Sequence, residues 1–366
     1  MTPPEETIWS MEPHTEAKHA ILEKYLQAWF PILARWNGRI IYYDGFAGPG
    51  VYSGDEEGSP LIALNVAKSH NYRPDTELVF IFVEKDEERA RTLQRIIEKE
   101  NLPENYHWKV MNEEFETALG ELLDYLEKEN LSLAPTFAFI DPFGIKGLPF
   151  SLIERLLRKA KSEVLITFMD STIQRFVSEL PEQINELIGN PSASDIIESS
   201  EDRIAEARKL YYNSLKGAAK FVRFFEMKDQ NNRTVYHLFF ATNHPRGHEK
   251  MKEAMWKADE SGLFRFSDAT DPKQRILFSP APQKDLVPIL GKKFKGKTAS
   301  SDEILKYTND ETVFLKKHAR KALKLLESDN GYKDYRIQVK STKKDGSPRK
   351  RGTFPPGTTI RFSKVS

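Results

Sequence analysis

Five strand-and-helix alternations, followed by two adjacent strands, constrain the fold of this chain more than any other feature of its sequence. Each predicted strand is a short apolar run, and each of the first five is followed by a segment in which apolar residues recur at helical spacing. Two more strands, 220–227 and 234–242, are joined by the polar segment 228–233, which predicts an antiparallel hairpin. The first five predicted strands are 39–44, 78–84, 106–111, 135–141 and 163–169.

This order predicts an α/β fold with a parallel, doubly wound sheet that an antiparallel hairpin closes. The expected fold class is the seven-stranded, Rossmann-like sheet of class I S-adenosylmethionine (SAM) methyltransferases, with its antiparallel last hairpin. Residues 171–217, between the fifth strand and the hairpin, are predicted to form a helical insertion. A NAD-dependent oxidoreductase would instead continue with parallel strand–helix units, so it is the weaker alternative.

Composition restricts the other possibilities. The chain has 366 residues, 39% hydrophobic and 30% charged, enough for a packed core in more than one domain. It contains no cysteine, which excludes disulfides, thiolate metal sites and a cysteine nucleophile. No metal site is expected, since His14 and His19 are five residues apart and lie on different helix faces. No apolar run approaches the ~20 residues of a membrane span and no secretory signal opens the chain, so a cytoplasmic protein without membrane contact is expected.

The charge is divided unevenly along the chain. Residues 291–366 hold 20 Lys or Arg against 8 Asp or Glu, a net charge of +12, whereas the whole chain has a net charge of +1. We therefore expect a methyltransferase-like domain over 1–275, a linker over 276–297 and a basic domain over 298–366. Two helices, a strand, a basic loop and a second strand make this last domain similar to a winged helix. Its charge favours a nucleic acid, RNA or DNA, as partner.

The cations of the basic domain fall into two groups. Four lie at helical spacing on one face of the predicted helix 312–327, opposite an apolar face, and five lie in the loop 340–356. Phosphate contacts are expected from both groups, with a merely solvated basic surface as the alternative. The helix supplies Lys317, Arg320, Lys321 and Lys324, and the loop supplies Lys343, Lys344, Arg349, Lys350 and Arg351.

A glycine-rich turn, Tyr-Asp-Gly-Phe-Ala-Gly-Pro-Gly, follows the first predicted strand. Open α/β sheets bind ligands at the carboxyl ends of their strands, and glycine lets the backbone pass close to a ligand. An acid at the strand end suits the cationic amine of SAM, and a tight turn without a ligand is the alternative. The candidate donor-binding residues here are Asp44, Gly45, Phe46, Gly48 and Gly50.

Three residues elsewhere extend this candidate donor site. Glu84 ends the second predicted strand, where a carboxylate can accept both ribose hydroxyls of an adenosine; an acid at the start of the next helix is the alternative. Asn112, after the third strand, is a weaker candidate for contact with the adenine. Lys18, in the predicted helix 15–33, can reach the donor carboxylate unless it is simply an exposed helix lysine.

The most specific motif is Asp141-Pro142-Phe143-Gly144, at the end of the fourth predicted strand. A planar exocyclic amine must be held by acceptors and stacked against an aromatic face while its lone pair meets the methyl group. Asp141 and the carbonyl of Pro142 are the expected acceptors, and Phe143 is the stacking face. These three are the candidate catalytic residues, and a tight turn that begins the next connection is the alternative.

These motifs and several other segments resemble the three-Cys-motif partner protein family (TcmP). The resemblance covers nearly the whole chain and implies a methyltransferase-like domain encoded beside a partner protein with a three-cysteine motif, without implying a known substrate. The motif at 141–144 is also similar to that of tRNA guanine-N2 dimethyltransferases, and more loosely to the Asp-Pro-Pro-aromatic motif of adenine-N6 enzymes, from which Phe143 departs. The segments that resemble TcmP are 14–19, 43–50, 58–60, 139–144, 167–169, 244–256 and 352–362.

The function expected from these features is SAM-dependent methyl transfer to a nucleic acid base, at an exocyclic amine. The alternative keeps the fold without the chemistry: a catalytically inactive, nucleic-acid-binding or scaffold partner of a three-cysteine-motif protein.

Overall fold

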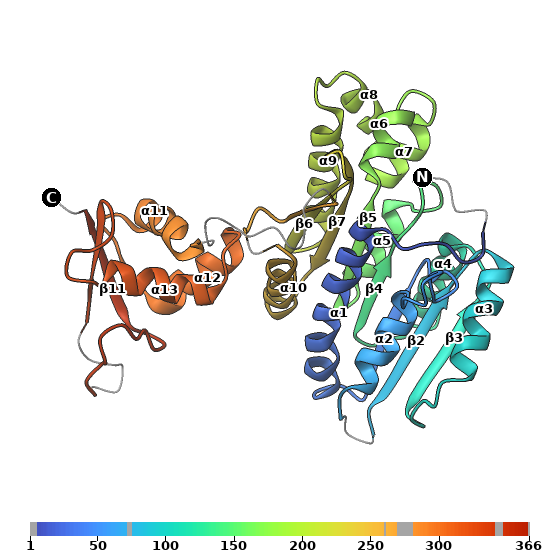
Figure 1. The fold of residues 1–366 in the computed structure, drawn as a ribbon, viewed down its shortest axis with the longest axis horizontal. Coiled ribbons are helices and arrows are strands. Elements are labelled where there is room, and N and C mark those ends of the chain that lie inside the picture. Colours follow the sequence, from blue (N-terminus) through green and yellow to red (C-terminus); the bar gives the residue numbers. More distant parts are fainter. Residues whose placement is uncertain (1–5, 72–74, 260, 269–280, 341–346, 365–366) are drawn as a thin grey trace. The chain divides into compact units, whose positions relative to one another are not determined.

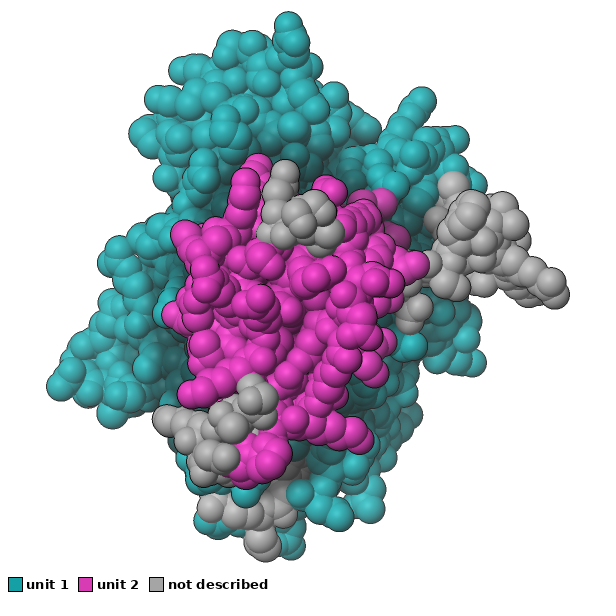
Figure 2. Space-filling view, turned by 90° about the vertical axis from the view of Figure 1, so that its left-hand side faces the viewer, with its two compact units in different colours: residues 1–258, 264–272 teal, residues 259–263, 273–366 magenta. Residues whose placement is uncertain are grey.

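The computed structural model describes residues 6–71, 75–259, 261–268, 281–340 and 347–364. The chain divides into two compact units, which Figure 2 shows in separate colours. Unit 1 comprises 1–258 and 264–272, and unit 2 comprises 259–263 and 273–366. No helix in the described part of the chain is long and apolar enough to cross a membrane.

An eight-stranded sheet forms the centre of unit 1 (Figure 1), in the order β3-β2-β1-β4-β5-β7-β6-β8. The five strands β1 to β5 are parallel to one another, and β7 is antiparallel to both β5 and β6, as the hairpin prediction requires. A short strand, β8, pairs parallel with β6 and adds to the seven strands predicted. The strands are β1 (Arg39–Asp44), β2 (Glu77–Val83), β3 (Tyr106–Met111), β4 (Thr136–Ile140), β5 (Ser162–Phe168), β6 (Phe221–Lys228), β7 (Thr234–Thr242) and β8 (Arg265–Ser267).

Helices cover this sheet and form the predicted insertion. The long first helix, α1 (Pro13–Ala34), lies beside α2 (Ser59–Lys68) and α10 (Pro245–Ala258) (Figure 1). The strands β4 and β5 are buried along their whole length, as expected for central strands of a sheet with both faces covered. The other helices are α3 (Glu87–Glu98), α4 (Phe115–Lys128) and α5 (Phe150–Arg158), then α6 (Asp170–Phe176), α7 (Pro181–Ile188), α8 (Ala193–Glu198) and α9 (Arg203–Ala218) in the insertion.

The strand order reverses at β1. This strand pairs with β2 on one side and with β4 on the other. The chain adds β2 and β3 on one side of β1 and then adds β4 and β5 on the other side. In the β1–β4 pairing Asp44 aligns with Phe139, which is two residues before Asp141. The carboxyl ends of these strands therefore open the crevice in which doubly wound sheets bind ligands.

Unit 2 combines three helices with a three-stranded antiparallel sheet in the order β10-β11-β9, within its described residues. Its first helix lies in the segment 276–297, so the prediction of a linker there is wrong. Leu286, Val287, Leu290 and Phe294 are apolar at helical spacing and buried, a pattern that the surrounding lysines obscured. The elements are α11 (Pro282–Phe294), β9 (Thr298–Ser300), α12 (Ser301–Glu311), α13 (Lys316–Leu326), β10 (Tyr335–Val339) and β11 (Thr359–Lys364).

Candidate functional site

Three carboxylates lie at the carboxyl ends of neighbouring strands in unit 1. Asp44 ends β1, Glu84 follows β2 and Asp141 follows β4. Because β1 lies between β2 and β4, these ends meet at one edge of the sheet. The glycine loop and Asp141 line a cleft at this edge, whereas Asp44 and Glu84 are buried and line neither of its two cavities.

The glycine loop, residues 45–50, leaves β1 as a tight turn. The Gly45 N–H donates to the Phe139 carbonyl at 2.9 Å, which ties the start of the loop to β4. Gly48 and Gly50 have φ angles of +63° and +87°, a left-handed conformation that residues with a side chain rarely adopt. The turn alone requires these glycines, so their presence does not by itself demonstrate a ligand.

Asp44 is fully buried beneath this loop. Its carboxylate accepts from the Tyr42 hydroxyl at 3.1 Å and from the Phe46 N–H at 3.3 Å, and Ser59 supplies a further hydrogen bond. Burial raises the pKa of the Asp44 carboxyl to about 7, although these hydrogen bonds oppose the rise. A buried acid with this pKa can switch between a neutral and a charged form near neutral pH.

Glu84 links the glycine loop to the start of α3. Its two carboxylate oxygens accept from the N–H groups of Gly48 and Asp86, each at 2.9 Å. Burial raises the pKa of Glu84. Each oxygen can accept another hydrogen bond, so the carboxylate fits two ribose hydroxyls. The Asn112 amide donates to the carbonyls of Glu84 and Lys85 at 3.1 and 2.8 Å, so its amide nitrogen supports this strand end.

Lys18 is paired with Asp141 at the base of the cleft. Its Nζ atom lies 2.5 Å from Asp141 Oδ2 and 5.2 Å from the centre of the Tyr236 ring. The Lys18 side chain is 6% exposed and that of Asp141 is 21% exposed. The alternative of an exposed helix lysine is therefore wrong, because α1 packs its Lys18 face against the sheet edge. Lys18 contacts the predicted catalytic acid rather than standing free for a donor carboxylate.

Trp9, which the sequence analysis did not select, lies inside the cleft. Its ring packs edge-on against Tyr52 and Phe143, with ring centres 5.8 and 5.5 Å apart, and the Arg89 guanidinium lies 4.8 Å from its ring. Its carbonyl accepts from the Ser53 N–H at 2.9 Å. A single tryptophan ahead of the first helix carries no periodic signal, so only the folded chain reveals its place.

The cleft contains two cavities, and Trp9 borders both. The glycine-loop cavity has about 30 Å³ of free space, and the Lys18 cavity has about 150 Å³. Both are bordered by Trp9, Tyr52, Asp141 and Phe143. The first is also lined by His19 and residues 46–51, and the second by His14, Thr15, Lys18, Pro142, Thr167, Met169 and Tyr236.

The two histidines of α1 take different positions at this cleft. Burial lowers the pKa of His19 to about 3, so its ring is neutral at pH 7. His14 contacts Asp268 at 2.9 Å and Glu12 at 3.0 Å. Within the described ranges, no group of three His, Cys, Asp or Glu side chains is placed to hold a metal ion.

The predicted phosphate-binding cations of unit 2 differ in availability. Lys317, Arg320, Lys321 and Lys324 are exposed on α13, opposite its buried apolar face. None of the four forms an ion pair with a residue that the structure describes. Lys343 and Lys344 lie outside the described residues, and Lys350 is exposed.

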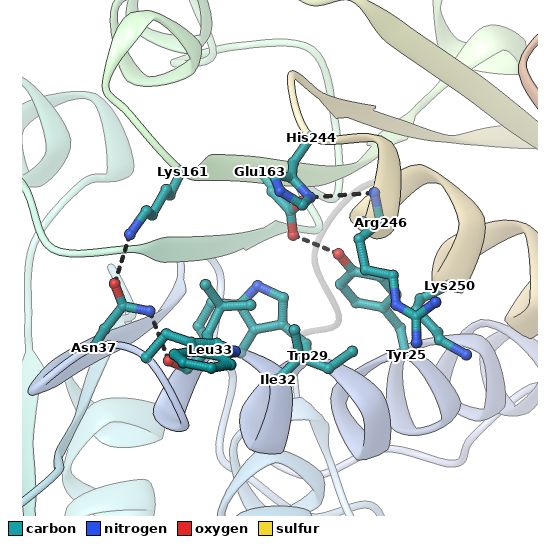
Figure 3. Close-up of a pocket in the computed structure, with 12 residues that line it drawn as sticks. Tyr25, Trp29, Ile32, Leu33, Asn37, Lys161, Glu163, His244, Arg246 and Lys250 are labelled. Atoms are coloured by element: carbon teal, nitrogen blue, oxygen red, sulfur yellow. Dashed lines mark hydrogen bonds between the residues drawn. The ribbon is translucent and has the colours of Figure 1, made fainter.

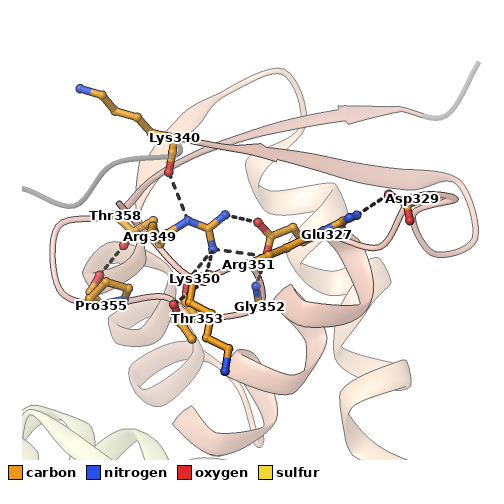
Figure 4. A network of polar contacts seen from close by, with 10 residues as sticks. All are labelled: Glu327, Asp329, Lys340, Arg349, Lys350, Arg351, Gly352, Thr353, Pro355 and Thr358. Carbon is orange, nitrogen blue, oxygen red and sulfur yellow. Dashed lines mark hydrogen bonds and ion pairs between the residues drawn. The ribbon is translucent and has the colours of Figure 1, made fainter. Parts of the chain in front are cut away.

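Arg349 does not fit the prediction of a phosphate contact. Its guanidinium pairs with Glu327, and the two side chains are 5% and 9% exposed (Figure 4). It also donates to the Thr353 carbonyl at 2.7 Å, so this arginine holds the loop onto α13. Arg351 is exposed but paired with Asp329 at 2.5 Å. Two of the five loop cations are thus engaged within unit 2.

The similarities of this chain to known proteins are weak. Neither a protein-family model nor a curated protein matches the sequence, so the resemblance to TcmP stays a prediction. A Legionella pneumophila protein of the DUF519 family aligns over 67% of this chain and 91% of its own length, at 14% identity and a TM-score of 0.41. An O-methyltransferase from Bacillus cereus, in complex with SAH, aligns over 64% and 83% at 15% identity and a TM-score of 0.34.

A SAM-dependent methyltransferase from Methanosarcina mazei aligns over 56% of this chain and 92% of its own, at 13% identity and a TM-score of 0.28. This chain has an α/β fold with a mostly parallel central sheet. What its cleft can bind depends on the residues that line it.

Proposed function

We propose that unit 1 is a SAM-dependent methyltransferase that acts on an exocyclic amine of a nucleic acid base. The observation that carries this proposal is that Asp44, Glu84 and Asp141 stand at the carboxyl ends of neighbouring strands, where the glycine loop and Asp141 line a cavity. Asp44 suits the cationic amine of the methionine part of SAM, and Glu84 suits the ribose hydroxyls of its adenosine part. The motif of Asp141 contains Phe143, whose ring suits stacking against a flat base that bears an amine.

The donor would be held by the first two acids. Asp44, when ionised, would pair with the ammonium of the methionine part, and Glu84 would accept from the ribose hydroxyls. Gly45, Phe46, Gly48 and Gly50 would bring the backbone close to the donor. SAM supplies an electrophilic methyl group when it is bound.

The target amine would be held by the Asp141 motif. Lys18 occupies Oδ2 of Asp141, whereas Oδ1 has no hydrogen-bond partner among the described residues. That oxygen is available to accept a hydrogen of the amine, together with the Pro142 carbonyl. Phe143 would stack against the ring. Lys18 thus becomes a positioning residue that fixes the orientation of the carboxylate.

Donor binding requires Trp9 to move. The glycine-loop cavity of about 30 Å³ is roughly a tenth of the ~300 Å³ at which small-molecule pockets begin, so it is too small for a nucleoside-sized donor. Displacing the Trp9 ring would join this cavity to the Lys18 cavity across Asp141, which borders both. Residues 6–12 would then act as a lid that leaves when the donor enters.

Unit 2 would hold the nucleic acid. Its elements follow the order helix, strand, two helices and two strands, and its sheet has the order β10-β11-β9. We take this order as support for a winged helix, whose wing would include residues 347–356. The exposed α13 cations Lys317, Arg320, Lys321 and Lys324 would contact phosphates. The rival role is docking of an acidic partner protein, such as a three-cysteine-motif protein.

The position of Trp9 also favours the second candidate function, a methyltransferase fold that has lost its chemistry and serves as a nucleic-acid-binding or scaffold partner. In that case the Trp9 contacts and the Lys18–Asp141 pair would be permanent. The two candidates differ in whether the cleft takes up SAM.

Calorimetry with SAM and with NAD on the purified chain tests the proposal. We expect micromolar binding of SAM and no binding of NAD. Glu84→Gln should weaken SAM binding about tenfold or more, because hydrogen bonds to a charged group contribute about 1.5–3 kcal/mol. The control is Glu87→Gln, an exposed acid at the start of α3 that pairs with Arg91. No SAM binding by the folded chain, or binding of NAD instead, overturns the proposal.

A further inference from the structure

A second cavity lies in unit 1, away from the cleft (Figure 3). It has about 270 Å³ of free space and is enclosed by the second half of α1, the amino end of β5 and the first turns of α10. The cleft lies at the carboxyl ends of the parallel strands, so this α1–α10 cavity lies toward the opposite edge of the sheet. The two share none of their lining residues.

One wall of the α1–α10 cavity is apolar and largely aromatic. Trp29, Ile32, Leu33 and Trp36 recur at spacings of three and four residues, which places them on one side of α1 and its end. Trp36 is 75% exposed, the largest exposed fraction among the large hydrophobic side chains described. An indole left in water next to a cavity gains free energy when a flat apolar molecule covers it.

Cations stand at both ends of this apolar wall. Figure 3 shows Lys161 at one end and Arg246 and Lys250, one helical turn apart on α10, at the other. Lys161 has a left-handed φ of +59°, an unfavourable conformation for a residue with a side chain. Its Nζ donates to Asn37 Oδ1 at 2.7 Å. This strained lysine is therefore held in a defined direction.

The carboxylate in the wall is already satisfied. Glu163 is buried and accepts from the Tyr25 hydroxyl and, at 2.7 Å, from the Thr242 hydroxyl. Burial raises the pKa of Glu163, although its hydrogen bonds from Tyr25 and Thr242 oppose the rise. Gly247 lets α10 approach this acid, because a Cβ there would lie 1.9 Å from Glu163 Oε1.

The acids near the Arg246 and Lys250 end are weak competitors for a ligand. Lys250 contacts Glu253 at 2.6 Å, and Arg246 lies 3.6 Å from Glu249. Arg246 and Glu253 are 50% and 42% exposed, whereas their partners Glu249 and Lys250 are 14% and 22% exposed, so water screens each pair from one side. A ligand anion seated on the apolar wall would be less screened.

We infer that the α1–α10 cavity is a binding site for a small aromatic anion, a one- or two-ring molecule that bears a carboxylate or phosphate. The ring would lie against Trp29 and Trp36, and the anionic group would contact Arg246 and Lys250. The volume of about 270 Å³ is just below the ~300–1,000 Å³ of pockets for drug-sized ligands, which favours a ligand of only one or two rings. This inference goes beyond the proposed methyl transfer and does not depend on it.

The test is calorimetry on the full chain with four probes: indole-3-acetate, phenyl phosphate, tryptamine and acetate. Indole-3-acetate and tryptamine carry similar rings and opposite charges. We expect saturable binding of the two aromatic anions with dissociation constants below about 1 mM, at least tenfold weaker binding of tryptamine, and no binding of acetate. Failure of both aromatic anions to bind, or equal binding of tryptamine, overturns the inference.

Variants locate the site. Arg246→Gln combined with Lys250→Gln should weaken indole-3-acetate binding about tenfold or more, whereas Lys257→Gln, an exposed lysine further along α10, should leave it unchanged. Leu33→Trp, which fills the cavity, should abolish binding, with folding checked by thermal unfolding. Equal losses in the double variant and the Lys257 control would place the ligand elsewhere and contradict the inference.

Discussion

The Nζ atom of Lys18 lies 2.5 Å from Oδ2 of Asp141, and together they join the second turn of α1 to the end of β4. The pair is largely shielded from water, with the lysine the more deeply buried of the two. Removal of one partner of such a shielded ion pair destabilises the fold, because the other charge is left buried without compensation. It therefore couples the fold of α1 to the candidate catalytic acid.

Lys18→Met should lower the free energy of unfolding by about 2 kcal/mol or more, because Asp141 would lose its partner; the partial exposure of Asp141 keeps the loss below that of a fully buried pair. The rate of methyl transfer should also fall in this variant. Chemical denaturation measures the first effect, and Lys24→Met, an exposed lysine on the same helix, is the control. Wild-type stability and turnover in Lys18→Met would show that the pair positions nothing.

Trp9→Ala should raise the affinity for SAM about tenfold or more. The donor would no longer displace two aromatic contacts and one cation–π contact, which contribute on the order of 0.5–1.5 kcal/mol each. Calorimetry measures the change, and Trp36→Ala, an exposed tryptophan outside the cleft, is the matched control. A fall in affinity would instead make Trp9 a direct contact of the donor.

Asp44 should make SAM binding depend on pH. With its pKa raised to about 7, the carboxyl is mostly neutral at pH 6, so affinity should rise up to tenfold per unit between pH 5.5 and 7 as the acid ionises. Calorimetry across this range measures the slope, which Asp44→Asn should flatten. A slope unchanged in Asp44→Asn would assign the proton to another group.

The raised pKa of Asp44 should also make the folding stability of the chain without donor depend on pH, with a trend opposite to that of SAM affinity. The folded state holds the proton more tightly than the unfolded state, so this contribution to stability is complete below about pH 4 and is lost as pH rises through about 7. The free energy of unfolding, relative to Asp44→Asn, should therefore decrease across that interval.

Charge reversal at Lys317, Arg320 and Lys321 should weaken nucleic acid binding and flatten its salt dependence. The slope of log affinity against log salt changes by about 0.9 for each phosphate contact on duplex DNA, so the triple variant should lose about two to three units. Filter binding over a salt series measures this. The control reverses Lys24, Arg91 and Lys257, three exposed cations of unit 1, and should keep the slope. Equal slopes in both variants would favour a protein partner for α13.

The sequence was sufficient for features that depend on local patterns. Apolar runs with helices between them predicted the parallel sheet and its closing hairpin, and Asp44, Glu84 and Asp141 each stand at the end of a strand, as expected from the sequence. These follow from strand geometry, because parallel strands place their carboxyl ends at one edge.

The features that were missed depend on contacts between distant parts of the chain. Nothing near Trp9 in the sequence indicates that its ring would pack against Phe143, and the burial of Lys18 depends on how α1 lies on the sheet edge. Arg349 belongs to a run of basic residues, yet its pairing with Glu327 across 22 positions makes it structural. A charge run does not distinguish a cation free for phosphate from one that holds a loop.

Transfer of a labelled methyl group from SAM to RNA and DNA, by the wild-type chain and by Asp141→Ala, tests the central claim most directly. The account predicts that the wild type labels an exocyclic amine in at least one of the two polymers. It also predicts that Asp141→Ala keeps its affinity for SAM within about threefold but transfers no methyl group. A wild-type chain that binds SAM and labels neither polymer would contradict the account, as would an Asp141→Ala variant that still transfers methyl groups at the wild-type rate.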